Sequence, residues 1–139
     1  MTSDAIPSQL NALLPQLSAD AVKLLIPYLT QLEAETGRVL VKQGDSGADV
    51  YFLLNGKFSV FEKIQINRSD VVLNVATFPG PGVLGEVSIM TATERTATVI
   101  VIERADCLVL TRDKFNALVK VNPQIGIELL QAFGAIMYG

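Results

Sequence analysis

Residues 83–99 read VLGEVSIMTATERTATV, and they are the most informative segment of the chain. Gly85 directly precedes Glu86, and Arg95 follows nine residues after that glutamate. A glycine before a short helix lets the backbone approach a ligand closely, and the first N–H groups of such a helix have no partner inside it. An arginine offers a planar fork of donors to phosphate oxygens. The segment therefore predicts an anion site built from backbone donors and one guanidinium.

Glu86 needs a separate explanation, because a carboxylate beside an anion site would repel phosphate. Its oxygens can accept hydrogen bonds from hydroxyl groups such as those of a ribose. Anion donors beside a hydroxyl acceptor indicate a sugar phosphate or a nucleotide, with the base against apolar strand residues. Taken singly, each feature also has a structural explanation. Glu86 and Arg95 could form a surface ion pair worth about 0–1 kcal/mol, and Gly85 could be an ordinary turn residue.

Short β-type segments separated by glycine turns surround residues 83–99. The predicted strands are residues 39–41, 50–54, 57–64, 71–78, 96–102 and 107–110. Asn55-Gly56 is the strongest hairpin dipeptide in the chain. Residues 79–82, Pro-Gly-Pro-Gly, end the strand before them. Several short strands at this spacing predict a β-sandwich or a barrel.

Helical periodicity frames this β-rich region over residues 1–35 and 112–139. Ser18, Thr111 and Asn122 are the predicted N-caps, and Pro15 and Pro27 keep the N-terminal helices short. The predicted apolar stripes are Val22, Leu25, Leu29 and Leu32 near the N-terminus, and Ile125, Leu129, Phe133 and Ile136 near the C-terminus.

Composition excludes several classes of function. The 139 residues suit one domain, 1–139, and the net charge of -3 argues against a large nucleic-acid surface. The chain has no histidine, which excludes a Ser-His-Asp triad and a His-ligated metal. Its one cysteine, Cys107, cannot form an internal disulfide and is expected to be a buried structural thiol.

The chain's ends and apolar runs bear on its location. Its first residues do not resemble a secretory signal, and no apolar run approaches the roughly 20 residues needed to cross a bilayer. With a single cysteine, these features lead us to expect a cytoplasmic protein without a membrane span.

The order Gly85-Glu86, an apolar, a small and two apolar residues, a short loop, and then Arg95-Thr96-Ala97-Thr98-Val99 closely resembles a known motif. It is similar to the phosphate-binding cassette of cyclic nucleotide-binding domains. Those domains occur in catabolite activator proteins, cyclic-nucleotide-dependent kinases and cyclic-nucleotide-gated channels. Upstream, Gln43-Gly44-Asp45 and residues 49–54 resemble the family's first barrel strands.

This resemblance implies a fold that is mainly β with flanking helices. The barrel would be a double-stranded β-helix, jelly-roll-like, over residues 36–111, with the cassette at 83–99. The N-terminal helices would occupy residues 1–35, and the C-terminal helices residues 112–139.

The resemblance also implies a role for each cassette residue. Glu86 would accept a hydrogen bond from the ribose 2′-hydroxyl, and Arg95 would pair with the exocyclic oxygens of the cyclic phosphate. Gly85 would allow close approach. The backbone N–H groups that would hold the same phosphate are those of Val87, Ser88 and Ala97.

Two cassette positions need comment. Glu94 stands where many members of the family have proline, although catabolite activators also have Glu-Arg there. At Thr96, a threonine favours cyclic GMP in some members by bonding the guanine amino group. Other members with threonine prefer cyclic AMP, so Thr96 leaves the choice of base open.

We therefore expect a regulatory binding module and not an enzyme. It would bind cyclic AMP or cyclic GMP, without a cofactor or metal, and relay binding by movement of the C-terminal helices. Its protein partner would be a second copy or a separate effector that contacts those helices. The main alternative is a degenerate relative that keeps the barrel but has lost the ligand and serves as a structural or partner-binding module. A cupin-like enzyme is a weak third reading, because cupins usually hold a metal through histidines.

Overall fold

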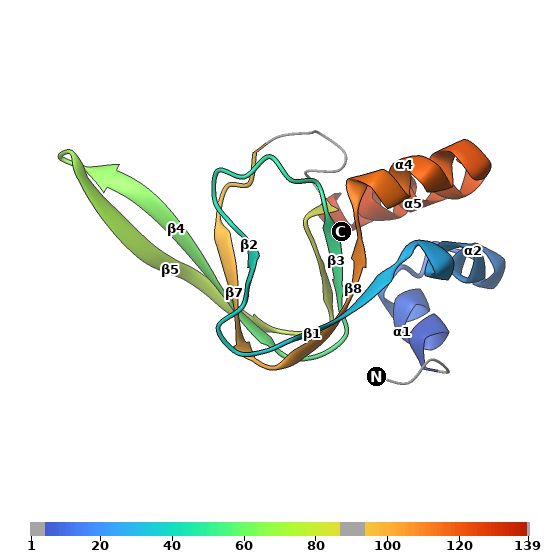
Figure 1. The fold of residues 1–139 in the computed structure, drawn as a ribbon, viewed down its shortest axis with the longest axis horizontal. Helices are drawn as coiled ribbons and strands as arrows, with labels where there is room; N and C mark the ends of the chain where they lie inside the picture. The colour runs from blue at the N-terminus through green and yellow to red at the C-terminus, as the bar shows by residue number, and fades with distance from the viewer. Residues whose placement is uncertain (1–4, 87–93, 139) are drawn as a thin grey trace.

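The computed structural model describes residues 5–86 and 94–138, whose centre is a barrel of two antiparallel four-stranded sheets (Figure 1). Helices from the two ends of the chain lie together beside the first sheet (Figure 1). The predicted jelly-roll barrel with N-terminal and C-terminal helices is confirmed. The first sheet has the order β1-β8-β3-β6 and the second the order β2-β7-β4-β5.

The six predicted strands are all present, one with the predicted bounds (residues 39–41) and the others with shifted ends. The strand bounds are β1 (Thr30–Ala34), β2 (Val39–Val41), β3 (Val50–Leu53), β4 (Lys57–Ile66), β5 (Ser69–Pro79), β6 (Gly82–Leu84), β7 (Thr98–Glu103) and β8 (Ala105–Leu110). Two of these, β1 and β6, have no counterpart in the sequence-based prediction. Both are short strands of the first sheet, and each pairs with a strand that is distant in sequence: β1 with β8, and β6 with β3.

The prediction of helix to residue 35 is wrong at its C-terminal end. The described helices there are α1 (Ile6–Leu13), α2 (Ala19–Leu25) and the short 3-10 helix η1 (Ile26–Tyr28). Pro27 lies in η1, and a proline inside a helix removes a hydrogen-bond donor and clashes with the preceding turn. The chain then extends as β1, which pairs with β8 from Thr30↔Val109 to Ala34↔Ala105. Leu32 therefore packs against the barrel interior and not on a helical stripe.

The prediction of a hairpin at Asn55-Gly56 is also wrong. This dipeptide links β3 to β4, which belong to different sheets. The long hairpin of the structure joins β4 to β5 at Asn67 and Arg68, which both have positive φ, 51° and 68°. Two consecutive residues with positive φ give the turn whose twist suits a two-residue hairpin.

The helices are capped as predicted, and they pack on the first sheet. Ser18 accepts from the Ala21 N–H at 3.1 Å, and Thr111 accepts from the Lys114 N–H at 3.2 Å at the start of α4 (Arg112–Val121). Asn122 accepts from the Ile125 N–H at 3.4 Å, at the start of α5 (Pro123–Tyr138).

Two hydrophobic clusters hold the fold together. One lies between the helices and the first sheet, where Phe133 of α5 meets Phe52 of β3 with ring centroids 6.3 Å apart. The other fills the barrel and contains Phe58 and Cys107. Cys107 is fully buried, which confirms its expected position. Among the described helices, none combines the length and apolar character that a bilayer crossing requires.

Candidate functional site

A cavity of about 320 Å³ lies between residues of β6 and the start of β7, and five of the seven predicted ligand residues line it. Glu86 and Arg95 both line it, although they are nine residues apart in the chain. The predicted residues Val87 and Ser88 lie outside the described residues. The residues that line the cavity are Val41, Val60, Val83, Leu84, Gly85, Glu86, Glu94, Arg95, Thr96, Ala97 and Val99.

Arg95 is held by the loop between β2 and β3. Its main-chain N–H donates to the Asp45 carbonyl at 2.8 Å, and its carbonyl accepts from the Gly44 N–H at 2.9 Å. Its side-chain Nη2 donates to the main-chain carbonyl of Asp49 at 2.6 Å. Three hydrogen bonds from one loop therefore fix both the backbone and the guanidinium of the residue predicted to bind phosphate.

Gly85 is required by geometry on two counts. Its φ of 90° lies in the left-handed region that side chains disfavour. A Cβ at this position would stand 2.5 Å from the Asp49 carbonyl oxygen and 2.6 Å from Nη1 of Arg95. The absence of a side chain at Gly85 thus leaves room for the Arg95 guanidinium. The sequence indicates a different reason for this glycine, the close approach of a ligand.

Burial shifts the charged groups of the site away from their ionised forms. The pKa of Glu86 is raised, chiefly because burial penalises its carboxylate, and a backbone hydrogen bond and the Arg95 charge offset part of that rise. The pKa of Arg95 is lowered by burial, and the negative charges of Asp49, Glu86 and Asp45 offset part of that lowering. An anionic ligand placed against Arg95 would compensate this desolvated cation. Within residues 5–86 and 94–138, no ion pair joins Glu86 to Arg95. A surface ion pair therefore does not explain why the two residues occur together.

The walls of the cavity are apolar and connect to both hydrophobic clusters. Val41, Val99 and Leu84 belong to or pack against the barrel cluster. Val83 packs against the cluster that contains α5. These walls offer an apolar surface to a planar ring, and the exposed Thr96 lines the same cavity with its hydroxyl-bearing side chain.

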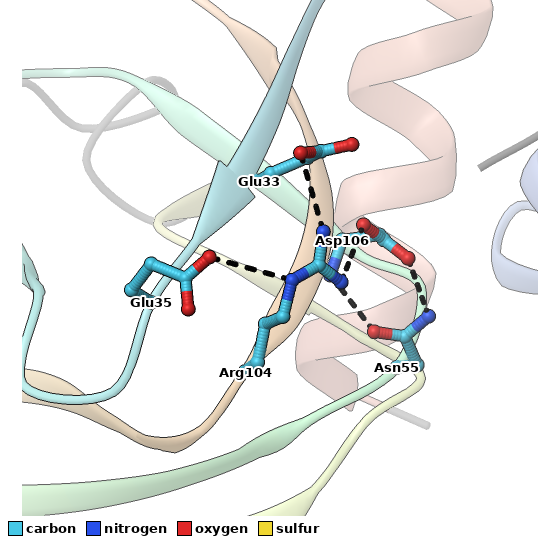
Figure 2. Close-up of polar contacts among 5 residues, drawn as sticks. All are labelled: Glu33, Glu35, Asn55, Arg104 and Asp106. Atoms are coloured by element: carbon cyan, nitrogen blue, oxygen red, sulfur yellow. Dashed lines mark hydrogen bonds and ion pairs between the residues drawn. The ribbon is translucent and has the colours of Figure 1, made fainter.

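Arg104 is an arginine of the same chain with a structural role, and its surroundings differ from those of Arg95. Its guanidinium is surrounded by Glu33 at 3.2 Å, Glu35 at 3.4 Å and Asp106 at 3.3 Å (Figure 2). Asp106 is fixed in turn by Asn55, whose Nδ2 donates to its carboxylate at 3.0 Å and whose Oδ1 accepts from its N–H at 2.8 Å. Three carboxylates neutralise Arg104, so this cluster has no charge left for an anion.

Within the described residues, no group of three or more acidic or cysteine side chains could hold a metal ion.

Sequence reasoning missed the residues that position Arg95. Asp49 acts through its main-chain carbonyl, and Asp45 and Gly44 through main-chain groups as well. Main-chain donors and acceptors occur at every residue type, so the sequence gives no sign of them and only the position of the loop in the structure identifies them. Tyr51 was also missed: its pKa is raised by burial and by the Asp49 charge, and the charge of Arg95 opposes that rise.

Comparison with known proteins agrees with the fold. Residues 31–122 match the family model described as cyclic nucleotide-binding domain. The chain is 28% identical over 114 residues to the cyclic AMP receptor protein of Thermus thermophilus, which covers 81% of this chain and 51% of that protein. It is 30% identical over 110 residues to lysophospholipase nte1 of Neurospora crassa, covering 78% of this chain but 7% of that much longer protein.

A solved structure of a cyclic nucleotide-binding domain from Methylobacillus flagellatus matches with a TM-score of 0.75 and 23% identity. The match covers 95% of this chain and 80% of the solved one. At this level of identity, the likeness supports the arrangement of strands and helices.

Proposed function

Since the chain belongs to the cyclic nucleotide-binding domain family, we propose that it binds a 3′,5′-cyclic nucleotide, cyclic AMP or cyclic GMP, in the cavity lined by Glu86 and Arg95. The observation that carries this proposal is the meeting of these two side chains at one cavity with apolar walls. A cyclic phosphate offers an anion to the guanidinium, and the adjoining ribose offers a hydroxyl to the carboxylate. The base would lie against the valines of the barrel wall, beside Thr96.

The site favours a regulatory module over an enzyme. The chain has no histidine, and its one cysteine is buried away from the cavity, so neither can act on a ligand there. Glu86 and Arg95 have binding roles that require no bond to be broken. We place this module in the cytoplasm, as expected for a chain with this cysteine usage.

Val83 offers a physical route from the cavity to the C-terminal helices. It lines the cavity and also packs against the cluster in which Leu129 and Phe133 of α5 are buried. A ligand moves a helix only if it interacts differently with two arrangements of that helix. We expect the ligand to shift β6 at Val83 and thereby repack α5. The exposed Ile127 and Leu130 on α5 would present this change to a partner protein.

One observation favours the alternative of a barrel without a ligand. Arg95 already donates a short hydrogen bond to the Asp49 carbonyl, so its guanidinium has a partner within the protein. In such a ligand-free module, Arg95 would serve only to hold the loop between β2 and β3 in place.

Thermal unfolding with added nucleotides separates the two functions. Cyclic AMP or cyclic GMP at about 100 times its dissociation constant should add about 2.7 kcal/mol to the free energy of unfolding. Linear 5′-AMP serves as the control, because its phosphate is not closed onto the ribose. No stabilisation by either cyclic nucleotide would favour the ligand-free module. Stabilisation by the linear nucleotide alone would contradict both.

A further inference from the structure

The β4–β5 hairpin combines an unpaired strand edge with exposed apolar side chains. In the described structure β5 is the last strand of its sheet, with β4 as its neighbour. Figure 1 shows the hairpin extending well beyond the barrel. Four of its large apolar side chains are strongly exposed: Ile66 (51%), Val72 (64%), Leu73 (42%) and Val75 (50%). A two-stranded ribbon of this kind is marginally stable in water without further contacts.

The edge of β5 lacks most of the usual protection against pairing. Proteins guard such edges with charged side chains, with proline, with short strands or with β-bulges. β5 has 11 residues, and residues 71–78 contain neither a charged residue nor a proline. A bulge at Val75, where Val60 pairs with Ala76 and Phe61 with Asn74, locally bends the strand. Most of the edge therefore presents its main-chain N–H and C=O groups to another strand.

We propose that β5 pairs antiparallel with β5 of a second copy of this chain. The β2-β7-β4-β5 sheet of one copy would then continue into the same sheet of the second copy across a two-fold axis. In such an interface the same surface occurs on both sides, so the strand must be compatible with itself. With Val75 left as the extra residue of the bulge on each strand, a register centred on Asn74 sets Asp70 beside Pro79 of the second copy. The uncharged residues 71–78 then face each other, and no two like charges are opposite.

The charges at the two ends of the strand favour a second copy as the occupant. Pro79 pairs with Lys57 on β4, and Asp70 pairs with Gln65. Alternation along β4 puts Lys57 and Gln65 on the same face of the sheet. In the proposed register, Asp70 lies about two strand spacings, ~10 Å between backbones, from Lys57 of the second copy. The two side chains together can span this gap, and symmetry makes the contact twice.

Within one chain, Asp70 has a weak partner for its charge. Its carboxylate lies 4.0 Å from Nζ of Lys63, with both side chains more than half exposed, and it accepts a hydrogen bond from Nε2 of the exposed Gln65 at 3.3 Å. Exposed pairs of this length contribute little. Asp70 can therefore turn toward a cation of the second copy without the loss of a strong contact.

Sedimentation velocity on the full chain, without nucleotide, tests this interface. Over a concentration series, the wild-type chain should form a species of twice its 15.0 kDa mass. The double variant Val72→Lys/Val75→Lys should dimerise at least tenfold more weakly. The matched control is Val121→Lys on α4, where the side chain is 76% exposed, and it should dimerise like the wild type. A wild-type chain that stays monomeric at every concentration overturns the proposal, as does a dimer that the double variant leaves unchanged.

Single cysteines provide a second readout if the lysines unfold the hairpin. Val72→Cys, Leu73→Cys and Val75→Cys place thiols near the proposed axis, and the native Cys107 is fully buried. Oxidation should link at least one of these folded variants into a disulfide-bonded dimer, and Val121→Cys should remain monomeric. Failure of all three to link while circular dichroism shows a folded chain would overturn the proposal. Neither experiment requires nucleotide, so the outcome is independent of the proposed function.

Discussion

Nη2 of Arg95 donates a hydrogen bond to the main-chain carbonyl of Asp49 across 2.6 Å, which ties the guanidinium of the cavity to the loop that enters β3. The two residues are 46 positions apart in the chain. A guanidinium has five N–H donors, so one hydrogen bond to a carbonyl can orient it toward a phosphate without using its whole donor set. The position of the proposed phosphate group is thus set by the barrel and not by the flexibility of a long side chain.

Gly85→Ala should disturb both the backbone and Arg95. The new Cβ would lie 2.5 Å from the Asp49 carbonyl oxygen at a φ of 90°, so one of the two must move. We expect a loss of about 1–3 kcal/mol in the free energy of unfolding, measured by urea denaturation. Gly82→Ala is the matched control, because nothing lies within 4 Å of its added Cβ. Equal stability of the two variants would contradict the close packing of Gly85 against Arg95.

Glu86→Gln should change stability and ligand binding in opposite directions. Because burial raises the pKa of Glu86 above its ordinary 4.5, folding favours the protonated form, and that contribution is lost as the pH rises through the folded-state pKa. The uncharged variant should therefore be more stable than the wild type at neutral pH, with the difference vanishing below pH 4.5. Its affinity for cyclic nucleotide should fall, since an amide oxygen is a weaker acceptor than a carboxylate.

Urea denaturation across a pH series and a nucleotide titration measure these two effects of Glu86→Gln. Glu94→Gln provides the comparison, because Glu94 lines the same cavity without an assigned ligand contact. A Glu86→Gln variant that binds as tightly as the wild type would remove the ribose role from Glu86.

Asn55→Ala should destabilise the protein and flatten its response to acid. The pKa of Asp106 is lowered, chiefly by the hydrogen bond from Asn55 and further by the charge of Arg104. This contribution to stability is complete above the unfolded value of 3.8 and is lost as the pH falls through the lower folded-state pKa. Loss of the Asn55 hydrogen bonds should cost about 1–3 kcal/mol at neutral pH by urea denaturation. An unchanged acid limb in the variant would show that Asn55 does not hold the Asp106 carboxylate.

Cys107 should resist alkylation in the folded protein. Burial, with a smaller effect from the Asp106 charge, raises the pKa of its thiol to about 11. The reactive thiolate is therefore scarce at neutral pH, and the side chain is inaccessible. Iodoacetamide should label it in urea but not in buffer, as measured by mass spectrometry. Rapid labelling of the native chain would mean that the barrel opens at β8.

Much of this fold is encoded in local sequence. The N-cap roles of Ser18, Thr111 and Asn122 follow from side chains that accept hydrogen bonds from nearby amides, so residue type is enough to place them. Strands such as β7 can be predicted from their β-branched residues. The cassette spacing brought Glu86 and Arg95 into one prediction, and the structure places both at one cavity.

The parts that escaped prediction depend on distant partners. Leu25, Leu29 and Leu32 have helical spacing, but β1 forms because β8 offers it an open edge. The hairpin turn at Asn67-Arg68 lacks the glycine that marks most such turns, and two long strands impose its backbone conformation. The hold of Asp49 on Arg95 uses a main-chain oxygen, which every residue type possesses.

Isothermal titration calorimetry of Arg95→Ala tests the central claim most directly, with Arg104→Ala as the matched loss of an arginine that is already surrounded by carboxylates. Removal of a charge-assisted hydrogen bond typically costs about 1.5–3 kcal/mol. We therefore expect Arg95→Ala to bind cyclic nucleotide at least about tenfold more weakly than the wild type, and Arg104→Ala to bind normally. Equal affinity of Arg95→Ala and the wild type would contradict the assignment of this cavity to a cyclic phosphate.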